Sequence, residues 1–252
     1  MAKSTLYQTR LDMMKPVINR LNGKAIKLLS IGAGTGHMED DLIRNCELQI
    51  SYYHAIEPNE SLLVDLRKTI SNWNIDFKVE QNYFSDGIEI DSTFDMILMS
   101  HCLYGMNEPL KAIIQAKSFL KPEGKLIIFH QSDKGGYELH THFTQNATFD
   151  RPPLNDGTLS SKHVCDMLKS SGVNYSVTEG NGTLEVDDFV RKRDTPIAND
   201  VITLFLQTRF ENLDDERKSE IFGMTKERCV KDPNGMYLFR HPVSMIQIVN
   251  TN

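Results

Sequence analysis

Short apolar runs alternate with amphipathic stretches over the first two thirds of the chain. Continuous apolar runs are typical of strands that are buried on both faces. They predict six strands, over residues 25–32, 51–59, 76–82, 94–104, 125–131 and 174–180. Apolar residues at helical spacing predict helices over residues 4–21, 37–45, 60–70, 108–120 and 160–172. This alternation predicts an α/β fold with a parallel sheet that is covered by helices on both faces.

The pattern changes after residue 180. Residues 200–213 and 215–230 have helical periodicity, and only residues 236–250 return to a strand pattern. We expect one domain over residues 1–252. The N-terminal helix, within residues 1–22, and a small helical insert, within residues 181–235, are natural elements to cover a substrate; extra packing layers are the alternative interpretation.

Composition and charge exclude several classes of protein. The 252 residues are 40% hydrophobic and 25% charged, which is typical of a globular protein. The net charge of −6 argues against binding to nucleic acid or to an anionic membrane. No apolar run approaches the roughly 18 residues of a membrane span, and the first residues lack the apolar segment of a signal peptide. The four cysteines form no C-x-x-C pair and fit a reducing compartment, so we expect a cytoplasmic protein. No exposed apolar helix stands out, so we expect a monomer.

A glycine-rich turn follows the first predicted strand and precedes a predicted helix. The stretch LLSIGAGTG contains Gly32, Gly34 and Gly36. Glycine lets the backbone approach a ligand, and a helix start offers N–H groups, so the turn predicts a nucleotide-binding site. His37 stands where a dinucleotide-binding loop needs its third glycine, which argues against a nicotinamide cofactor.

An acidic residue ends the second predicted strand. Glu57 lies 57 − 36 = 21 residues after Gly36. An acid about 20 residues after such a turn can accept hydrogen bonds from ribose hydroxyls. We therefore predict that Glu57 binds the sugar of a cofactor, together with the three glycines.

The G-x-G-x-G pattern resembles the first motif of the class I S-adenosylmethionine-dependent methyltransferases. FDMILMSHCLYGMNEP resembles their fourth strand and following loop, and LKPEGKLIIF resembles their fifth strand. The resemblance implies a Rossmann-like seven-stranded sheet, mostly parallel, with an antiparallel last strand. It implies S-adenosylmethionine as the cofactor and S-adenosylhomocysteine as the product. It also implies cofactor contacts from Ser100 and from Tyr83 or Phe84. Core packing is the alternative for the two aromatic residues.

At a finer level the chain resembles the histamine N-methyltransferase family. The stretches that carry this resemblance are IEPNE, CLYGMNEPLKA, FLQTRF and LFRHPVSMIQIV. Four polar residues that the family uses for its amine or its cofactor are replaced, by Leu6, Leu62, His101 and His241. The resemblance therefore implies a retained cofactor frame with altered recognition of the methyl acceptor.

Five residues are candidates for the substrate chemistry. Methyl transfer needs a nucleophile held about 3 Å from the methyl carbon, and a base helps when that nucleophile carries a proton. Histidine suits this task near neutral pH. We predict His101, at the end of the fourth strand, as the catalytic residue. We predict substrate contacts from Tyr7, Tyr104, His130 and His241. Core packing is the alternative for Tyr104, and a capping or packing role is the alternative for the histidines.

His140 and His142 form an H-x-H pair, which could bind a metal from a strand but would diverge on a helix. No third ligand is evident, so we predict no metal.

Together these features predict methylation of a small molecule, most directly N-methylation of an amine, an imidazole or an amino acid derivative. O-methylation of a phenol or carboxylate stays open, with His101 as the base and Arg240 or a histidine holding an anion. A non-catalytic, methyltransferase-like binding protein is the alternative outside enzymes. The acidic balance argues against a nucleic-acid substrate.

Overall fold

The computed structural model describes residues 4–85, 88–146, 159–191 and 213–250. The chain divides into two compact units. The sheet unit comprises Arg10–His130, His163–Thr178 and Ser244–Asn252, and the second unit comprises Met1–Thr9, Gln131–Lys162 and Glu179–Val243. The prediction that residues 1–22 and 181–235 cover a substrate stays a prediction.

A seven-stranded sheet of order β3-β2-β1-β4-β5-β10-β6 forms the centre of the sheet unit. Its strands are β1 (Ile26–Ile31), β2 (Ile50–Ile56), β3 (Asp76–Glu80), β4 (Phe94–Ser100), β5 (Leu120–Gln131), β6 (Ser176–Gly180) and β10 (Val243–Val249). The pairs β1–β2, β1–β4, β2–β3 and β4–β5 are parallel. The last strand, β10, is antiparallel, so the predicted fold class is confirmed.

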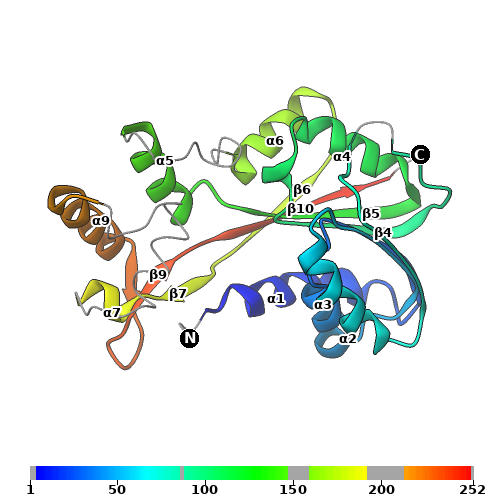
Figure 1. Ribbon diagram of the computed structural model, residues 1–252, viewed down its shortest axis with the longest axis horizontal. Helices are drawn as coiled ribbons and strands as arrows, with labels where there is room; N and C mark the ends of the chain where they lie inside the picture. Colours follow the sequence, from blue (N-terminus) through cyan, green and yellow to red (C-terminus); the bar gives the residue numbers. More distant parts are fainter. Residues whose placement is uncertain (1–3, 86–87, 147–158, 192–212, 251–252) are drawn as a thin grey trace. The chain divides into compact units, whose positions relative to one another are not determined.

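Helices cover both faces of this sheet (Figure 1). They are α1 (Leu6–Asn19), α2 (His37–Cys46), α3 (Glu60–Ser71), α4 (Pro109–Ser118) and α6 (Ser161–Ser170). Figure 1 shows α1, α2 and α3 on one side of the sheet and α4 and α6 on the other. Because both faces of the central strands are covered, β1 and β4 are apolar along almost their whole length.

The direction of the chain reverses beside β1. From β1 it moves outward through β2 to β3, and it then returns to place β4 on the other side of β1. In open α/β sheets, ligands bind beyond the carboxyl ends of the strands at such a switch point. The topology therefore predicts a ligand-binding site at the carboxyl ends of β1 and β4.

The predicted strand boundaries differ most from the structure at β4 and β5. The strand predicted over residues 94–104 ends at Ser100, because His101 adopts a left-handed backbone conformation with φ of 53°. The strand predicted over 125–131 starts at Leu120, and the predicted turn at residues 121–124 is held within it as a bulge. The bulge is fixed by β10, since Glu123 N–H donates to the Asn250 carbonyl (2.8 Å).

The second unit has a sheet of its own, which the sequence pattern did not predict. Its strands are β7 (Thr183–Glu185), β8 (Cys229–Lys231) and β9 (Tyr237–Arg240), and both pairs in the order β7-β9-β8 are antiparallel. Its helices are α5 (Gly136–Asn146), α7 (Asp187–Val190) and α9 (Asp215–Glu227). The core of this unit is a buried cluster of Leu139, Val186, Phe189, Ile221 and Phe239. The insert is thus partly strand, and the helix predicted over 200–213 lies outside the described residues.

The final strand predicted over residues 236–250 is two strands. It breaks at His241 and Pro242, between β9 and β10. Pro242 has no N–H group to give to a ladder, and His241 N–H donates to the Gly182 carbonyl at 2.9 Å. One apolar run therefore supplies strands to two different sheets.

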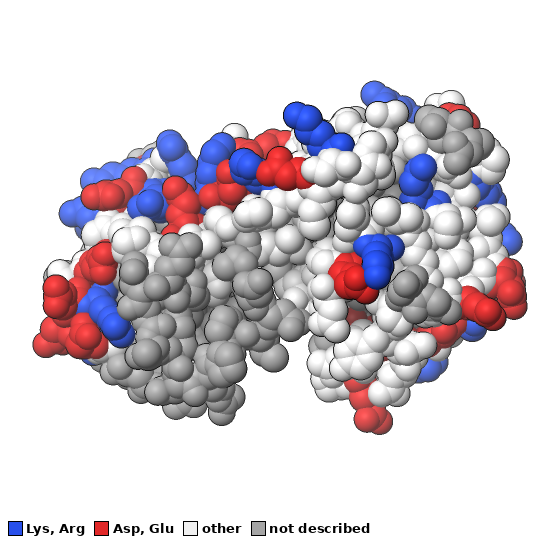
Figure 2. Space-filling model, turned by 90° about the horizontal axis from the view of Figure 1, so that it is seen from above, with Lys and Arg blue, Asp and Glu red and all other residues white. Residues whose placement is uncertain are grey.

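Within the part of the chain that the structure describes, no helix is long and apolar enough to cross a membrane. On the face shown in Figure 2, basic and acidic side chains are interspersed.

Candidate functional site

The turn between β1 and α2 contains three glycines, two of which are required by packing. A side-chain carbon added at Gly32 would overlap the Cβ of Cys102. One added at Gly36 would lie 2.8 Å from Cδ1 of Leu66 on α3. These glycines let the turn pack closely on the loop after β4 and let α2 pack closely on α3.

Gly34 differs from its two neighbours. Its φ is +58°, but an added side-chain carbon would meet nothing within 4 Å. Its N–H group donates to Oε2 of Glu57 at 2.8 Å. Packing therefore does not explain Gly34, whose backbone borders open space at the carboxyl end of β1.

Glu57 is a buried carboxylate held by backbone groups. It follows the last residue of β2 and is only 5% exposed. Oε2 accepts from Gly34, Oε1 accepts from Asn59 N–H at 2.9 Å, and the N–H of Glu57 itself donates to the Glu80 carbonyl at 3.0 Å. A carboxylate has about four acceptor positions, so each oxygen keeps the capacity to accept from a ligand hydroxyl.

A second buried acid, which the sequence did not lead us to predict, links the two elements on either side of the turn. Glu39 in the first turn of α2 is 3% exposed and accepts a hydrogen bond from Ser30 Oγ of β1 at 2.5 Å. Burial raises the pKa of Glu39, while the Ser30 bond and the charge of Arg10 act in the opposite direction. The bond ties the start of α2 to β1. The available signal was an acid in the first turn of a helix, which is also common on exposed surfaces.

The predicted cofactor contacts after β3 and β4 occupy different environments. Phe84 is buried and packs edge-on against Phe119, with ring centroids 6.5 Å apart. Tyr83 is 71% exposed. Ser100 is half-buried at the end of β4. Phe84 thus has a core role, and the cofactor contacts of all three residues stay predictions.

Three of the predicted substrate-site residues form one aromatic stack. His101 follows β4, Tyr104 lies in the short helix η1 (Leu103–Gly105), and His130 is a fully buried residue of β5. The rings of His101 and Tyr104 are nearly parallel, at 16°, with centroids 6.3 Å apart. The rings of Tyr104 and His130 lie 4.3 Å apart at 30°. Nδ1 of His101 and the Tyr104 hydroxyl are hydrogen-bonded at 3.3 Å.

Cys102 connects this stack to the glycine turn. It directly follows His101, and its Cβ is the atom that leaves no room for a side chain at Gly32. Burial raises the pKa of the Cys102 thiol to about 12, so it stays protonated and acts as a packing group. The turn, Glu57 and the aromatic stack therefore belong to one edge of the sheet.

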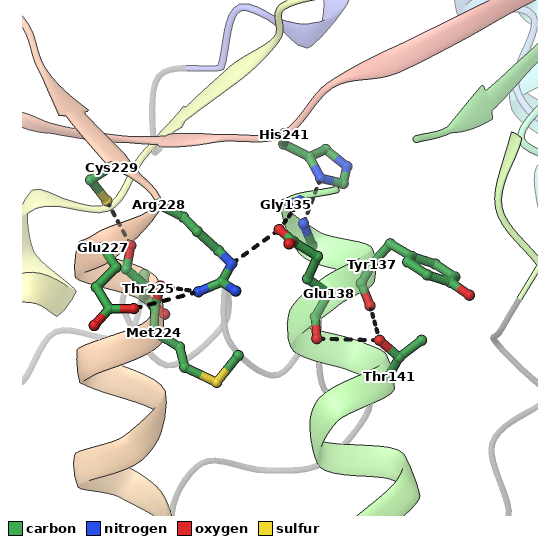
Figure 3. A network of polar contacts seen from close by, with 11 residues as sticks. Gly135, Tyr137, Glu138, Thr141, Met224, Thr225, Glu227, Arg228, Cys229 and His241 are labelled. Atoms are coloured by element: carbon green, nitrogen blue, oxygen red, sulfur yellow. Dashed lines mark hydrogen bonds and ion pairs between the residues drawn. The ribbon is translucent and has the colours of Figure 1, made fainter. Parts of the chain in front are cut away.

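His241 belongs to the second unit and binds a helix start (Figure 3). Its Nδ1 accepts from Gly136 N–H of α5 at 3.3 Å. Burial lowers the pKa of His241 to about 4, so the ring is neutral near pH 7. Figure 3 shows the adjoining network, in which Glu138 accepts from Gly135 N–H (2.9 Å) and from Arg228 Nε (3.0 Å).

Tyr7 lies on α1 and is half-buried. The predicted substrate contacts of Tyr7 and His241 stay predictions.

The H-x-H pair lies on a helix, α5, where the two side chains diverge. His142 Nε2 is hydrogen-bonded to Glu220 Oε1 of α9 at 2.6 Å. Within the described ranges, no group of three histidine, cysteine or acidic residues is arranged to hold a metal ion.

The fold and the site define a class. A sheet of this order with an antiparallel last strand, a glycine turn after β1 and an acid at the end of β2 is the Rossmann-like arrangement of nucleotide-cofactor enzymes. The family model described as "Methyltransferase domain" matches residues 7–173, about two thirds of the chain, and the chain belongs to this family. The resemblance to methyltransferases is thereby confirmed.

Individual relatives are distant. The chain is similar to Histamine N-methyltransferase A of Xenopus laevis, with 23% identity over 242 residues, which are 88% of this chain and 81% of that protein. Among solved structures, it is similar to the YcgJ protein of Bacillus subtilis (TM-score 0.62, 15% identity, 97% of this chain and 99% of that chain). It is also similar to the N-methyltransferase NodS of Bradyrhizobium japonicum, in complex with S-adenosyl-l-homocysteine (TM-score 0.54, 11% identity, 97% and 87%). At these identities the structural likenesses show the fold.

Proposed function

We propose that this protein transfers a methyl group from S-adenosylmethionine to a nitrogen atom of a small molecule. The acceptor belongs to the amines, imidazoles or amino acid derivatives, and S-adenosylhomocysteine is the second product. The observation that carries the proposal is the pair formed by Gly34, which borders open space, and Glu57, a buried acceptor bonded to it. The match to a methyltransferase domain supports assigning this pair to the binding of S-adenosylmethionine.

The residues at the turn fit the cofactor. A ribose presents neighbouring hydroxyls, and Glu57 offers two fixed carboxylate oxygens beside a backbone without a side chain. Gly32, Gly34 and Glu57 would hold the cofactor, with further contacts from Ser100 and from Tyr83 or Phe84. When bound, S-adenosylmethionine supplies an electrophilic methyl group on a sulfonium.

The aromatic stack supplies the remaining chemistry. Methyl transfer requires an oriented acceptor and the exclusion of water. Tyr104 is half-buried and stacks on the fully buried ring of His130, and it provides a flat ring surface against which a planar acceptor can be oriented. His101, at the carboxyl end of β4, would take the proton that the acceptor loses.

Nitrogen is favoured over oxygen as the acceptor atom. The relatives from Xenopus laevis and Bradyrhizobium japonicum are N-methyltransferases by name, and the former resembles most of this chain. By the resemblance to the histamine N-methyltransferase family, the apolar Leu6 replaces a polar residue that recognises the amine. This replacement supports an acceptor with less positive charge than histamine. A proton acceptor at His101 would serve a phenol equally well, so O-methylation is the second candidate.

A labelled-methyl screen against amines, imidazoles, amino acids, phenols and carboxylates tests the acceptor class. Transfer to nitrogen compounds alone supports the proposal, and transfer to phenols or carboxylates alone replaces it with O-methylation. Calorimetry tests the cofactor. Absence of heat with both S-adenosylmethionine and S-adenosylhomocysteine would contradict an enzyme of this kind and favour a non-catalytic binding protein.

We further propose that the protein is a cytoplasmic monomer that acts on small molecules rather than nucleic acid. The interspersed charges on the face in Figure 2 support the last point. Sedimentation velocity tests the oligomeric state. Binding assays with oligonucleotides at low and high salt test the substrate class, and we expect no binding at either salt concentration.

A further inference from the structure

The hydrogen bond between His101 and Tyr104 bears on which nitrogen of His101 can act as a base. A neutral imidazole carries one proton, and its position depends on the hydrogen bond that the other nitrogen makes. Here Nδ1 is the nitrogen bonded to the Tyr104 hydroxyl, at 3.3 Å. The bond to Tyr104 therefore uses Nδ1 and not Nε2.

Both partners in this bond are held in place. The His101 backbone is left-handed (φ 53°), and its N–H donates to the Phe129 carbonyl of β5 at 2.9 Å. Tyr104 is fixed by its contact with the fully buried ring of His130 and by Leu103, which is 1% exposed. A residue other than glycine in this conformation persists where surrounding contacts enforce it, which is common at functional sites.

The direction of the bond follows from the chemistry of a base. A phenol oxygen can accept from Nδ1–H both before and after Nε2 gains a proton, so that orientation needs no rearrangement. If the phenol donated instead, Nε2 would already carry the ring proton and could not accept another. The accepting orientation also stabilises the protonated ring, since both of its nitrogens are donors.

We propose that Tyr104 is a positioning residue, which holds His101 with its proton on Nδ1 so that Nε2 receives the proton of the methyl acceptor. This inference rests on the proposed function. As the acceptor nitrogen bonds to the methyl carbon, the electron pair of the carbon–sulfur bond passes to sulfur. The proton displaced from nitrogen then moves to Nε2. Tyr104 itself exchanges no proton.

Among the described residues, His130 lies in the stack with Tyr104, and Cys102 directly follows His101. Replacing tyrosine with phenylalanine keeps the ring against His130 and removes only the oxygen. The variant Tyr104→Phe therefore tests the hydroxyl that is bonded to His101.

Long-range ¹H–¹⁵N spectra of protein labelled in its histidine rings provide the test, because they report which ring nitrogen carries the proton. The His101 signals are assigned by their loss in His101→Gln. We expect Nδ1–H in the wild-type protein. In Tyr104→Phe we expect the proton to move to Nε2 and the midpoint of His101 protonation to move to lower pH. Tyr52→Phe, which removes a phenol on β2, is the matched control and should leave the His101 signals unchanged.

An Nε2–H form of His101 in the wild-type protein overturns the inference, and this result needs no variant to fold. Unchanged His101 signals in Tyr104→Phe also overturn it. The spectra require no turnover, so this failure is distinct from that of the proposed function, which calorimetry with the cofactor would show. With an acceptor in hand, Tyr104→Phe should shift the pH profile of kcat in the same direction as the midpoint.

Discussion

Replacing Glu57 with alanine tests the cofactor site most directly. The variant removes the carboxylate that would accept a hydrogen bond from the ribose, and it also leaves the N–H groups of Gly34 and Asn59 without this partner. A hydrogen bond to a charged group contributes about 1.5–3 kcal/mol. At about 1.4 kcal/mol per tenfold change, the Kd for S-adenosylhomocysteine should rise roughly 10- to 150-fold.

Isothermal titration calorimetry measures this change, and Glu60→Ala is the matched control. Glu60 is exposed at the start of α3, so its removal changes the charge equally while leaving the turn intact. Glu57→Gln should not restore affinity. Its single amide oxygen can face one of the two backbone N–H groups, and its NH₂ group must then face the other.

A cycle that varies both protein and ligand separates loss of the sugar contact from collapse of the turn. Analogues of S-adenosylhomocysteine without the 2′- or the 3′-hydroxyl should bind the wild-type protein more weakly. They should lose much less affinity for Glu57→Ala, because the partner of the hydroxyl is already absent. If the two penalties simply add, Glu57 does not contact the ribose and the assignment is refuted.

Three further predictions concern the base, the turn and the second unit. His101→Ala should lower kcat far more than cofactor affinity, and turnover at the wild-type rate would refute its role as the base. Gly36→Ala should lower the free energy of unfolding by about 2–5 kcal/mol, from a left-handed backbone and a clash with Leu66. Gly34→Ala, which meets no clash, should lower the free energy of unfolding by only about 1–2 kcal/mol, but it should weaken cofactor binding more than Gly36→Ala does. Urea denaturation measures the stability of the two variants, and calorimetry measures their cofactor affinity. A larger loss of stability in Gly34→Ala than in Gly36→Ala would contradict the packing argument. Because the pKa of His241 is lowered from 6.5 to about 4 on folding, the unfolded chain takes up this proton first. The free energy of unfolding should therefore fall as the pH drops from about 6.5 toward 4. His241→Asn keeps a hydrogen-bond acceptor, and in urea denaturation at pH 7 and pH 5 it should show a smaller loss than the wild-type protein. An equal loss in both proteins would argue against His241 as its source.

The sequence alone determined the elements that depend on local periodicity and on short motifs. Apolar runs predicted β1 and β4 because strands covered on both faces must be apolar throughout. The glycine turn and Glu57 were predictable because strand and helix lengths set the spacing between the ends of neighbouring parallel strands. Neither conclusion requires knowledge of which distant residues meet.

The tertiary structure decided what depends on contacts between distant segments. It separated Gly32 and Gly36, which are required by Cys102 and Leu66, from Gly34, which borders open space. It divided one apolar run at Pro242 between two sheets, since periodicity records only that a residue is buried and not which partner buries it. It also brought His101, Tyr104 and His130 into one stack, because parallel strands far apart in sequence end at the same edge of the sheet.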